Sequence, residues 1–222
     1  MKKATAFIIL STIVFAFTSV KKTKIIFFGD SITQAGVNPG GYIMCIDSMC
    51  VKDGQKENYE FTGAGIGGNK IYDLYLRIED DVMAKNPDMV FIYVGVNDVW
   101  HKSTSGTGTD ADKFEKFYTA VIKKLIDKNI KVVLCTPATI GEKNDFSNPQ
   151  DGDLNQYSKI IRGLATKNNL PLVDLRKLFL EYNLKNNPEN KTKGILTTDG
   201  VHLNAKGNQL IAGEMWKVIK SL

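Results

Sequence analysis

Short apolar runs alternate with longer amphipathic runs through most of this 222-residue chain. The apolar runs are rich in β-branched residues at successive positions, which is typical of strands buried on both faces. Alternation of such strands with helices predicts an α/β fold, with a parallel sheet, right-handed crossovers and helices on both faces. The predicted strands cover residues 24–29, 59–65, 89–95, 131–137 and 170–175.

The amphipathic runs predict the helices between and after these strands. In residues 70–85, for example, Ile71, Leu74 and Ile78 share one helical face. The other predicted helices cover residues 110–128, 153–168 and 204–222. Because no linker, repeat or low-complexity tract interrupts the pattern, residues 21–222 are predicted to form a single domain.

Residues 1–20 have a different composition. Lys2 and Lys3 precede an uncharged, mostly apolar run, 4–20, which ends in small residues such as Ala16 and Ser19. This order is typical of a secretory signal peptide, and the run is marginal for spanning a bilayer, which takes about 20 apolar residues. We therefore expect a secreted or periplasmic protein with no stable membrane insertion after cleavage. An uncleaved N-terminal anchor is the alternative.

Charge and cysteine content exclude some classes of function. Cleavage would remove Lys2 and Lys3 and lower the formal net charge from +5 to +3. The remaining lysines are scattered, so no nucleic-acid partner is expected. Two histidines far apart and no C-x-x-C motif predict no metal site. The three cysteines are interpreted as buried thiols, although Cys45 and Cys50 could pair in an oxidising compartment.

Three polar or glycine-rich stretches follow three of the predicted strands. They are GDS at 29–31, GIGGN at 65–69 and GVND at 95–98. In parallel sheets, ligands bind outside the carboxyl ends of the strands. These stretches are therefore candidates for one site.

Ser31, in the first stretch, could be a nucleophile or a helix cap. A serine hydroxyl is a poor nucleophile unless a base lies within hydrogen-bond reach and a third group orients that base. Asp199 and His202, in TDGVHLN just before the last predicted helix, could supply both. The other histidine, His101, lies in a polar stretch interpreted as a rim loop, where it would contact substrate or simply be exposed.

The second stretch belongs to GAGIGGN, residues 63–69, which could supply backbone N–H donors to an oxyanion. Gly63, Gly65 and Gly68 also match the G-x-G-x-x-G pattern of dinucleotide sites. That alternative requires an acid at the end of the next strand. Asp88 has about the right spacing but precedes its strand, which disfavours the dinucleotide interpretation.

The third stretch contains Asn97, whose amide could donate to the same oxyanion. Alternatively, Asn97 is only a turn residue. Asp98 is expected to brace the local structure. Trp100 could line the acyl pocket, stack on a sugar ring or only pack.

Together these blocks resemble the SGNH hydrolases, the GDSL-type esterase/lipase family. The matching blocks are GDSIT with Ser31, GIGGN with Gly68, GVND with Asn97, and DGVH with Asp199 and His202. The resemblance implies a three-layer α/β/α flavodoxin-like fold with a five-stranded parallel sheet and a Ser–His–Asp triad. It also implies oxyanion donors at Ser31, Gly68 and Asn97, with Gly67 as an alternative to Gly68. Position 33 is threonine, so the chain lacks the G-x-S-x-G turn of ordinary α/β-hydrolases.

The expected function is hydrolysis of short-chain esters, with acetyl groups on carbohydrates favoured, through an acyl-enzyme and without a cofactor. The family also includes lysophospholipases and lipase-like acylhydrolases, which remain alternatives. A carbohydrate-binding module on a retired hydrolase scaffold is the non-enzymatic alternative. The oligomeric state is not predicted.

Overall fold

The computed structural model describes residues 21–222, and the predicted signal peptide or anchor lies outside the described residues. Five strands and the helices between them follow the predicted alternation. In chain order the elements are β1 (Thr23–Gly29), α1 (Ser31–Gly36), α2 (Tyr42–Lys52), β2 (Tyr59–Gly65), α3 (Ile71–Asp81), the 3-10 helix η1 (Met83–Lys85), β3 (Met89–Tyr93), α4 (Val96–Thr104), α5 (Ala111–Ile126), β4 (Lys131–Cys135), α6 (Asp151–Lys167), β5 (Leu172–Val173), α7 (Leu175–Asn186) and α8 (Ala205–Ser221).

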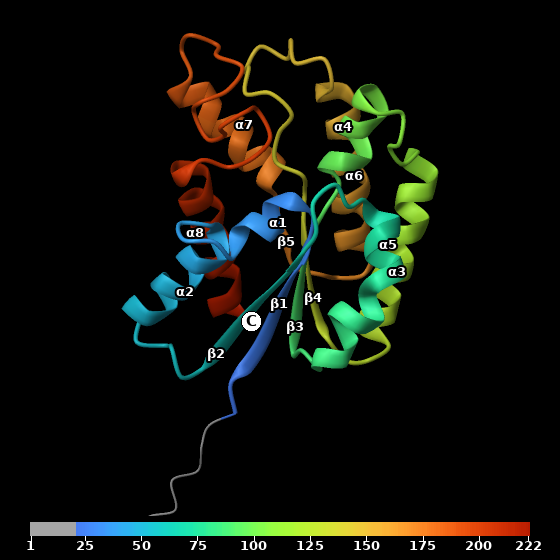
Figure 1. Ribbon diagram of the computed structural model, residues 1–222, viewed down its shortest axis with the longest axis vertical. Coiled ribbons are helices and arrows are strands. Elements are labelled where there is room, and N and C mark those ends of the chain that lie inside the picture. Colours follow the sequence, from blue (N-terminus) through green and yellow to red (C-terminus); the bar gives the residue numbers. More distant parts are fainter. Residues whose placement is uncertain (1–20) are drawn as a thin grey trace, which may run out of the picture.

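The five strands form one parallel sheet in the order β2-β1-β3-β4-β5. This is the flavodoxin-like order, in which the chain moves first to one side of β1 and then to the other. The predicted three-layer fold with a five-stranded parallel sheet is therefore confirmed. All strands end at the upper edge of the sheet in Figure 1, so the three polar stretches after β1, β2 and β3 meet there.

Helices cover both faces of the sheet. Figure 1 shows α2, α7 and α8 on one side and α3, α5 and α6 on the other. The central strands β1 and β3 are buried on both faces, and the aromatic rings of Phe27 and Phe91 pack 5.1 Å apart across them. Burial of each such side chain contributes about 1.5–3 kcal/mol.

Element ends differ from the sequence prediction in several places. β3 and β4 end two residues early, at Tyr93 and Cys135, and β5 keeps only Leu172 and Val173. The predicted helix 70–85 ends at Asp81, because the backbone of Val82 leaves the helical region with φ of −125°, and η1 follows.

Within residues 21–222, four helices lie outside the ranges that the amphipathic pattern predicts: α1, α2, α4 and α7. The last two show why the pattern fails. The first part of the stretch interpreted as a rim loop, residues 100–104, belongs to α4, because Val96 and Val99 are buried and anchor this helix to the core. The chain after β5 forms α7, where Leu175 and Phe179 supply a buried stripe at a spacing of four. In both cases packing against the rest of the fold outweighs a weak local pattern.

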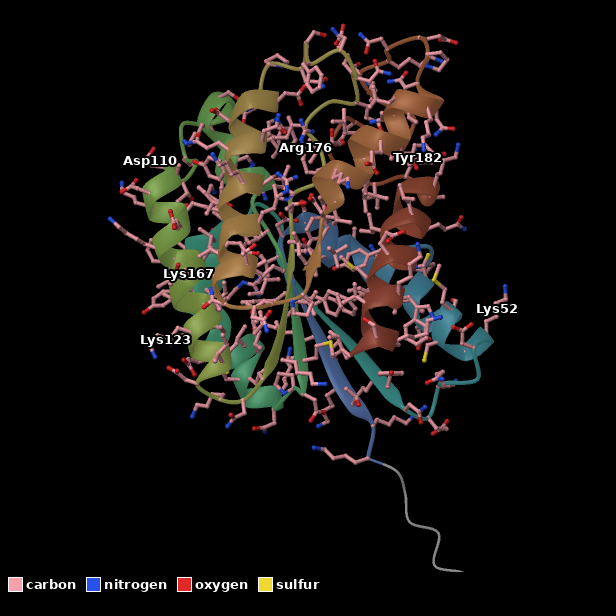
Figure 2. All side chains as sticks on the ribbon, turned by 180° about the vertical axis from the view of Figure 1, so that it is seen from behind. Lys52, Asp110, Lys123, Lys167, Arg176 and Tyr182 are labelled. Atoms are coloured by element: carbon pink, nitrogen blue, oxygen red, sulfur yellow. The ribbon has the colours of Figure 1, made fainter. Side chains whose placement is uncertain are left out.

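Lysines are spread over the surface of the described part (Figure 2). Figure 2 shows Lys52, Lys123 and Lys167, which lie near the C-terminal ends of α2, α5 and α6. Their separation is consistent with scattered rather than clustered charge. Among the helices of residues 21–222, none has both the length and the apolar character needed to cross a membrane. Cys45 and Cys50 both lie on α2 and are free thiols, so no disulfide joins them.

Candidate active site

Ser31 is the first residue of α1, directly beyond the end of β1. Asp30, not Ser31, caps this helix: its Oδ1 atom accepts the Ile32 N–H at 3.0 Å. The serine hydroxyl is therefore free for another partner. Ser31 Oγ lies 2.9 Å from His202 Nε2.

Asp199 completes the chain of contacts that starts at Ser31. Its Oδ2 atom lies 2.7 Å from His202 Nδ1. Its Oδ1 atom accepts the backbone N–H groups of Val201 and His202 at 2.9 and 2.8 Å. The side chains of His202 and Asp199 are 37% and 46% exposed, so solvent water can reach the imidazole. The structure thus brings together the three residues that sequence analysis assigned to a triad.

A buried glutamate anchors the loop that holds Asp199 and His202. The Glu142 carboxylate accepts N–H groups from the chain just before that loop, at Ile195, Leu196 and Thr197, with distances of 2.8, 2.6 and 3.0 Å. Thr197 in turn pairs with Leu203 in an antiparallel bridge that closes the loop. Sequence analysis missed Glu142, because no local pattern shows that a glutamate after β4 meets residues more than 50 positions later.

The loop after β2 lies beside Ser31. At Gly65 a side chain would be impossible, because a Cβ atom there would lie 2.1 Å from the backbone nitrogen of Gln34. Gly67 donates its N–H to Gln34 Oε1 at 2.8 Å. Gly68 has φ of +76°, and among the described residues its N–H has no hydrogen-bond partner. Of the two glycines, Gly68 therefore has the free donor.

Asn97 lies at the start of α4 and is buried. Its Nδ2 atom donates to the carbonyl of Asn69 at 3.1 Å, which uses one of the two amide hydrogens and orients the other. The neighbouring Asp98 braces the local structure, because its Oδ1 atom accepts the Ile71 N–H at 3.2 Å and so joins α4 to the start of α3.

Two further side chains, those of Arg77 and Lys70, contact the loop after β2. Arg77 on α3 donates from Nε to Asn69 Oδ1 at 2.7 Å, and from Nη2 to the carbonyls of Gly29 and Ala64 at 2.8 and 3.1 Å. Lys70 is buried and donates from Nζ to the Gly68 carbonyl at 3.2 Å. Neither residue was singled out from the sequence, because each acts through backbone groups that only the fold brings near.

Trp100 and His101, on α4, border the site. The Trp100 ring meets the His202 ring edge to face, with centroids 6.2 Å apart. The His101 ring lies close to Gly68: a Cβ atom added to Gly68 would be 3.8 Å from His101 Cε1. Burial and the charge of Lys70 lower the pKa of His101.

Burial and hydrogen bonding shift the carboxyl groups in opposite directions. Burial raises the pKa of Asp30 to about 7 and that of Asp98 to about 6. For Asp199, partial burial raises the pKa, but hydrogen bonds from His202 and Val201 outweigh it and the net pKa is lowered. Asp199 is therefore ionised at neutral pH, as a group that stabilises an imidazolium must be.

The geometry offers little to a dinucleotide or a metal ion. Asp88 lies at the amino-terminal ends of the strands, where its Oδ2 atom accepts the Lys24 N–H at 2.8 Å. It therefore cannot meet a ligand on the glycine loop, which lies at the carboxyl ends. In the part of the chain that the structure describes, no three His, Cys, Asp or Glu side chains are grouped to bind a metal ion.

Comparisons with known proteins agree with this geometry. The model of the GDSL-like lipase/acylhydrolase family matches residues 27–210. An acetylxylan esterase of Geobacillus stearothermophilus is 28% identical over 205 residues, covering 85% of this chain and 90% of its own. The crystal structure of the acetyl xylan esterase AlAXEase is 67% identical, with a TM-score of 0.87, and covers 88% of this chain and 99% of its own. The crystal structure of Axe2, an acetylxylan esterase from Geobacillus stearothermophilus, is 25% identical, with a TM-score of 0.78, and covers 91% of this chain and 96% of its own.

Proposed function

Since this chain belongs to the GDSL-like lipase/acylhydrolase family and is a carboxylic ester hydrolase, we propose that it is a serine esterase that removes acetyl groups from carbohydrates. The observation that carries the carbohydrate part is the 67% identity to an acetyl xylan esterase over 88% of this chain. Acetylated xylo-oligosaccharides are accordingly the proposed substrate class.

In the proposed mechanism, Ser31 Oγ attacks the ester carbonyl while His202 Nε2 takes its proton. The 2.9 Å separation of these atoms supports this role. The tetrahedral oxyanion is stabilised by the N–H groups of Ser31 and Gly68 and by the Asn97 amide. Asp199 holds the imidazole in place and stabilises its charged form.

Collapse of the tetrahedral intermediate breaks the bond to the sugar oxygen, which receives the proton from His202. An acetyl-enzyme on Ser31 remains. His202 then takes a proton from water, whose oxygen attacks the acetyl carbonyl. Release of acetate returns the proton to Ser31.

A substrate panel tests this proposal. Wild-type protein and Ser31→Ala are compared for acetate release from acetylated xylo-oligosaccharides and for hydrolysis of p-nitrophenyl acetate and decanoate. We expect Ser31-dependent release of acetate and a preference for acetate over decanoate. Faster hydrolysis of decanoate would favour a lipase-like acylhydrolase, and no reaction with a fluorophosphonate at Ser31 would favour a binding module.

We further propose that residues 1–20 act as a signal peptide and that the enzyme works outside the cytoplasm. The proposal is supported by Lys2 and Lys3 before the apolar run 4–20. Expression of the full chain, cell fractionation and N-terminal sequencing of the product test it. Retention of Met1 on a membrane-bound product would indicate an anchor instead.

A further inference from the structure

Gln34 connects the helix that carries Ser31 to the loop that carries Gly68. It lies on α1, one turn after Ser31, and its side chain is exposed. Its carboxamide oxygen accepts the Gly67 N–H at 2.8 Å. No catalytic motif in the sequence includes this residue.

This contact decides which glycine can serve the oxyanion. A backbone N–H stabilises developing charge only if it is aimed at the oxygen and is not already bound elsewhere. Gly67 N–H is occupied by Gln34, whereas Gly68 N–H is free of other partners within residues 21–222. Gln34 therefore favours Gly68 as the donor.

The contact also controls the position of the loop. A Cβ atom at Gly67 would lie 3.1 Å from Gln34 Oε1 and 4.0 Å from Ser31 Cβ, so the loop backbone lies close to both side chains. Lys70 and Asn97 hold the carbonyls of Gly68 and Asn69. Gln34 adds a hydrogen bond at Gly67, on the side of the loop next to Ser31.

The charge of Gln34 is as relevant as its geometry. A glutamate at this position could accept the same hydrogen bond, because its carboxylate has the same reach. It would, however, place a negative charge beside the site where the oxyanion forms. A neutral acceptor satisfies Gly67 N–H without that repulsion.

We propose that Gln34 is a positioning residue for the esterase reaction: by binding Gly67 N–H as a neutral acceptor, it sets Gly68 N–H for the oxyanion. The inference rests on the proposed function. It predicts effects on the rate of the chemical step rather than on substrate binding.

Two variants separate geometry from charge. Gln34→Met keeps the chain length and removes the acceptor, and Gln34→Glu keeps the acceptor and adds a charge. With p-nitrophenyl acetate we expect kcat of Gln34→Met to fall about 10- to 100-fold, the size of effect that a small misplacement causes, while KM changes little. Gln55→Glu is the charge control, because Gln55 is in the exposed loop between α2 and β2.

The Gln34→Glu variant adds a pH readout that a purely structural role would not produce. Its kcat deficit relative to wild type, compared at the same pH, should stay constant from pH 8 to pH 6 and shrink as pH falls through the ordinary carboxyl range, near about 4.3, where the carboxyl loses its charge. Gln55→Glu should show no such dependence. Faster hydrogen exchange at the Gly67 amide in Gln34→Met would show that the contact has been lost.

Several outcomes would overturn the inference. Wild-type kcat in Gln34→Met would remove Gln34 from the reaction. Equal losses in both variants, with lowered melting temperatures and no pH dependence, would reduce its role to stability. In either case wild-type activity and an inactive Ser31→Ala would leave the proposed function intact, whereas an inactive wild type would contradict the function and the role of Gln34 together.

Discussion

Ser31 and His202 are separated by 171 positions in the chain, yet Ser31 Oγ and His202 Nε2 lie 2.9 Å apart. The parallel sheet explains this proximity. Ser31 follows β1, an inner strand between β2 and β3, and Glu142 holds the loop that carries His202 at the same, carboxyl-end edge of the sheet. A serine with this partner is expected to react as a nucleophile rather than to serve as a cap.

Replacement of Ser31 by alanine is therefore expected to remove almost all esterase activity. The loss in kcat should be about 10⁴- to 10⁶-fold, and the remaining activity should come from the oxyanion donors and substrate binding. Initial rates with p-nitrophenyl acetate measure it. Ser48→Ala is the matched control, because Ser48 is an exposed serine on α2. Similar rates for both variants would show that Ser31 is not the nucleophile.

Asn97→Ala is expected to weaken the reaction without abolishing it. Removal of one oxyanion donor typically costs about 10²- to 10³-fold in kcat. Because Asn97 also donates to the Asn69 carbonyl, the loop that carries Gly68 should loosen as well. Steady-state kinetics should show the loss in kcat rather than in KM. An unchanged kcat would exclude Asn97 from the oxyanion site.

Asp199→Asn is expected to lower kcat by up to about 10⁴-fold, because the amide can hold His202 in the wrong tautomer. The lowered pKa of Asp199 keeps it ionised across the assay range, so the loss should persist at every pH assayed. Steady-state kinetics measure it, and a kcat equal to that of wild type would contradict the assigned role.

Glu142→Gln is expected to destabilise the fold and, through it, the loop that carries the triad acid and base. The amide group cannot accept all three N–H groups, and a buried unsatisfied donor costs about 1–3 kcal/mol. Urea denaturation measures the loss in the free energy of unfolding. Glu189→Gln is the control, because Glu189 is exposed and, within residues 21–222, forms its one ion pair with Lys191, at 2.9 Å. Equal stability of the two variants would show that Glu142 is dispensable.

Much of the fold and the triad could be predicted from the sequence, because their signals are local. Buried strands such as 89–93 are continuously apolar, and Ser31, Asn97 and His202 each lie in a short block after a strand or before a helix. α4 was missed because its polar sequence resembles a loop, and Val96 and Val99 are its sole buried apolar residues.

The supporting contacts of the site could not be predicted, because they depend on the tertiary arrangement. Gln34, Arg77 and Glu142 each contact backbone groups of other elements. Backbone groups carry no sequence signature, so no spacing rule points to these partners. For the same reason the choice between Gly67 and Gly68 stayed open until the contact to Gln34 was known.

Asp30→Asn tests a stability effect whose sign follows from burial. Burial raises the pKa of Asp30 from 3.8 to about 7, so the native state holds a proton that the unfolded chain releases between those pH values. The stability of the wild type should therefore fall as pH rises from about 4 to about 7, by as much as about 4 kcal/mol. Asparagine cannot ionise, yet it can still accept the Ile32 N–H that Asp30 binds.

The expected result is an Asp30→Asn variant that gains stability over wild type between pH 5 and pH 8, measured by thermal unfolding at each pH. Asp88→Asn is a control of opposite sign, because the Lys24 N–H lowers the pKa of Asp88. Its carboxylate stabilises the native state above about pH 4, and this contribution is lost as pH falls further. The Asp88 variant should therefore be less stable than wild type at neutral pH. A pH-independent difference for Asp30→Asn would mean that its carboxyl titrates normally in the native state.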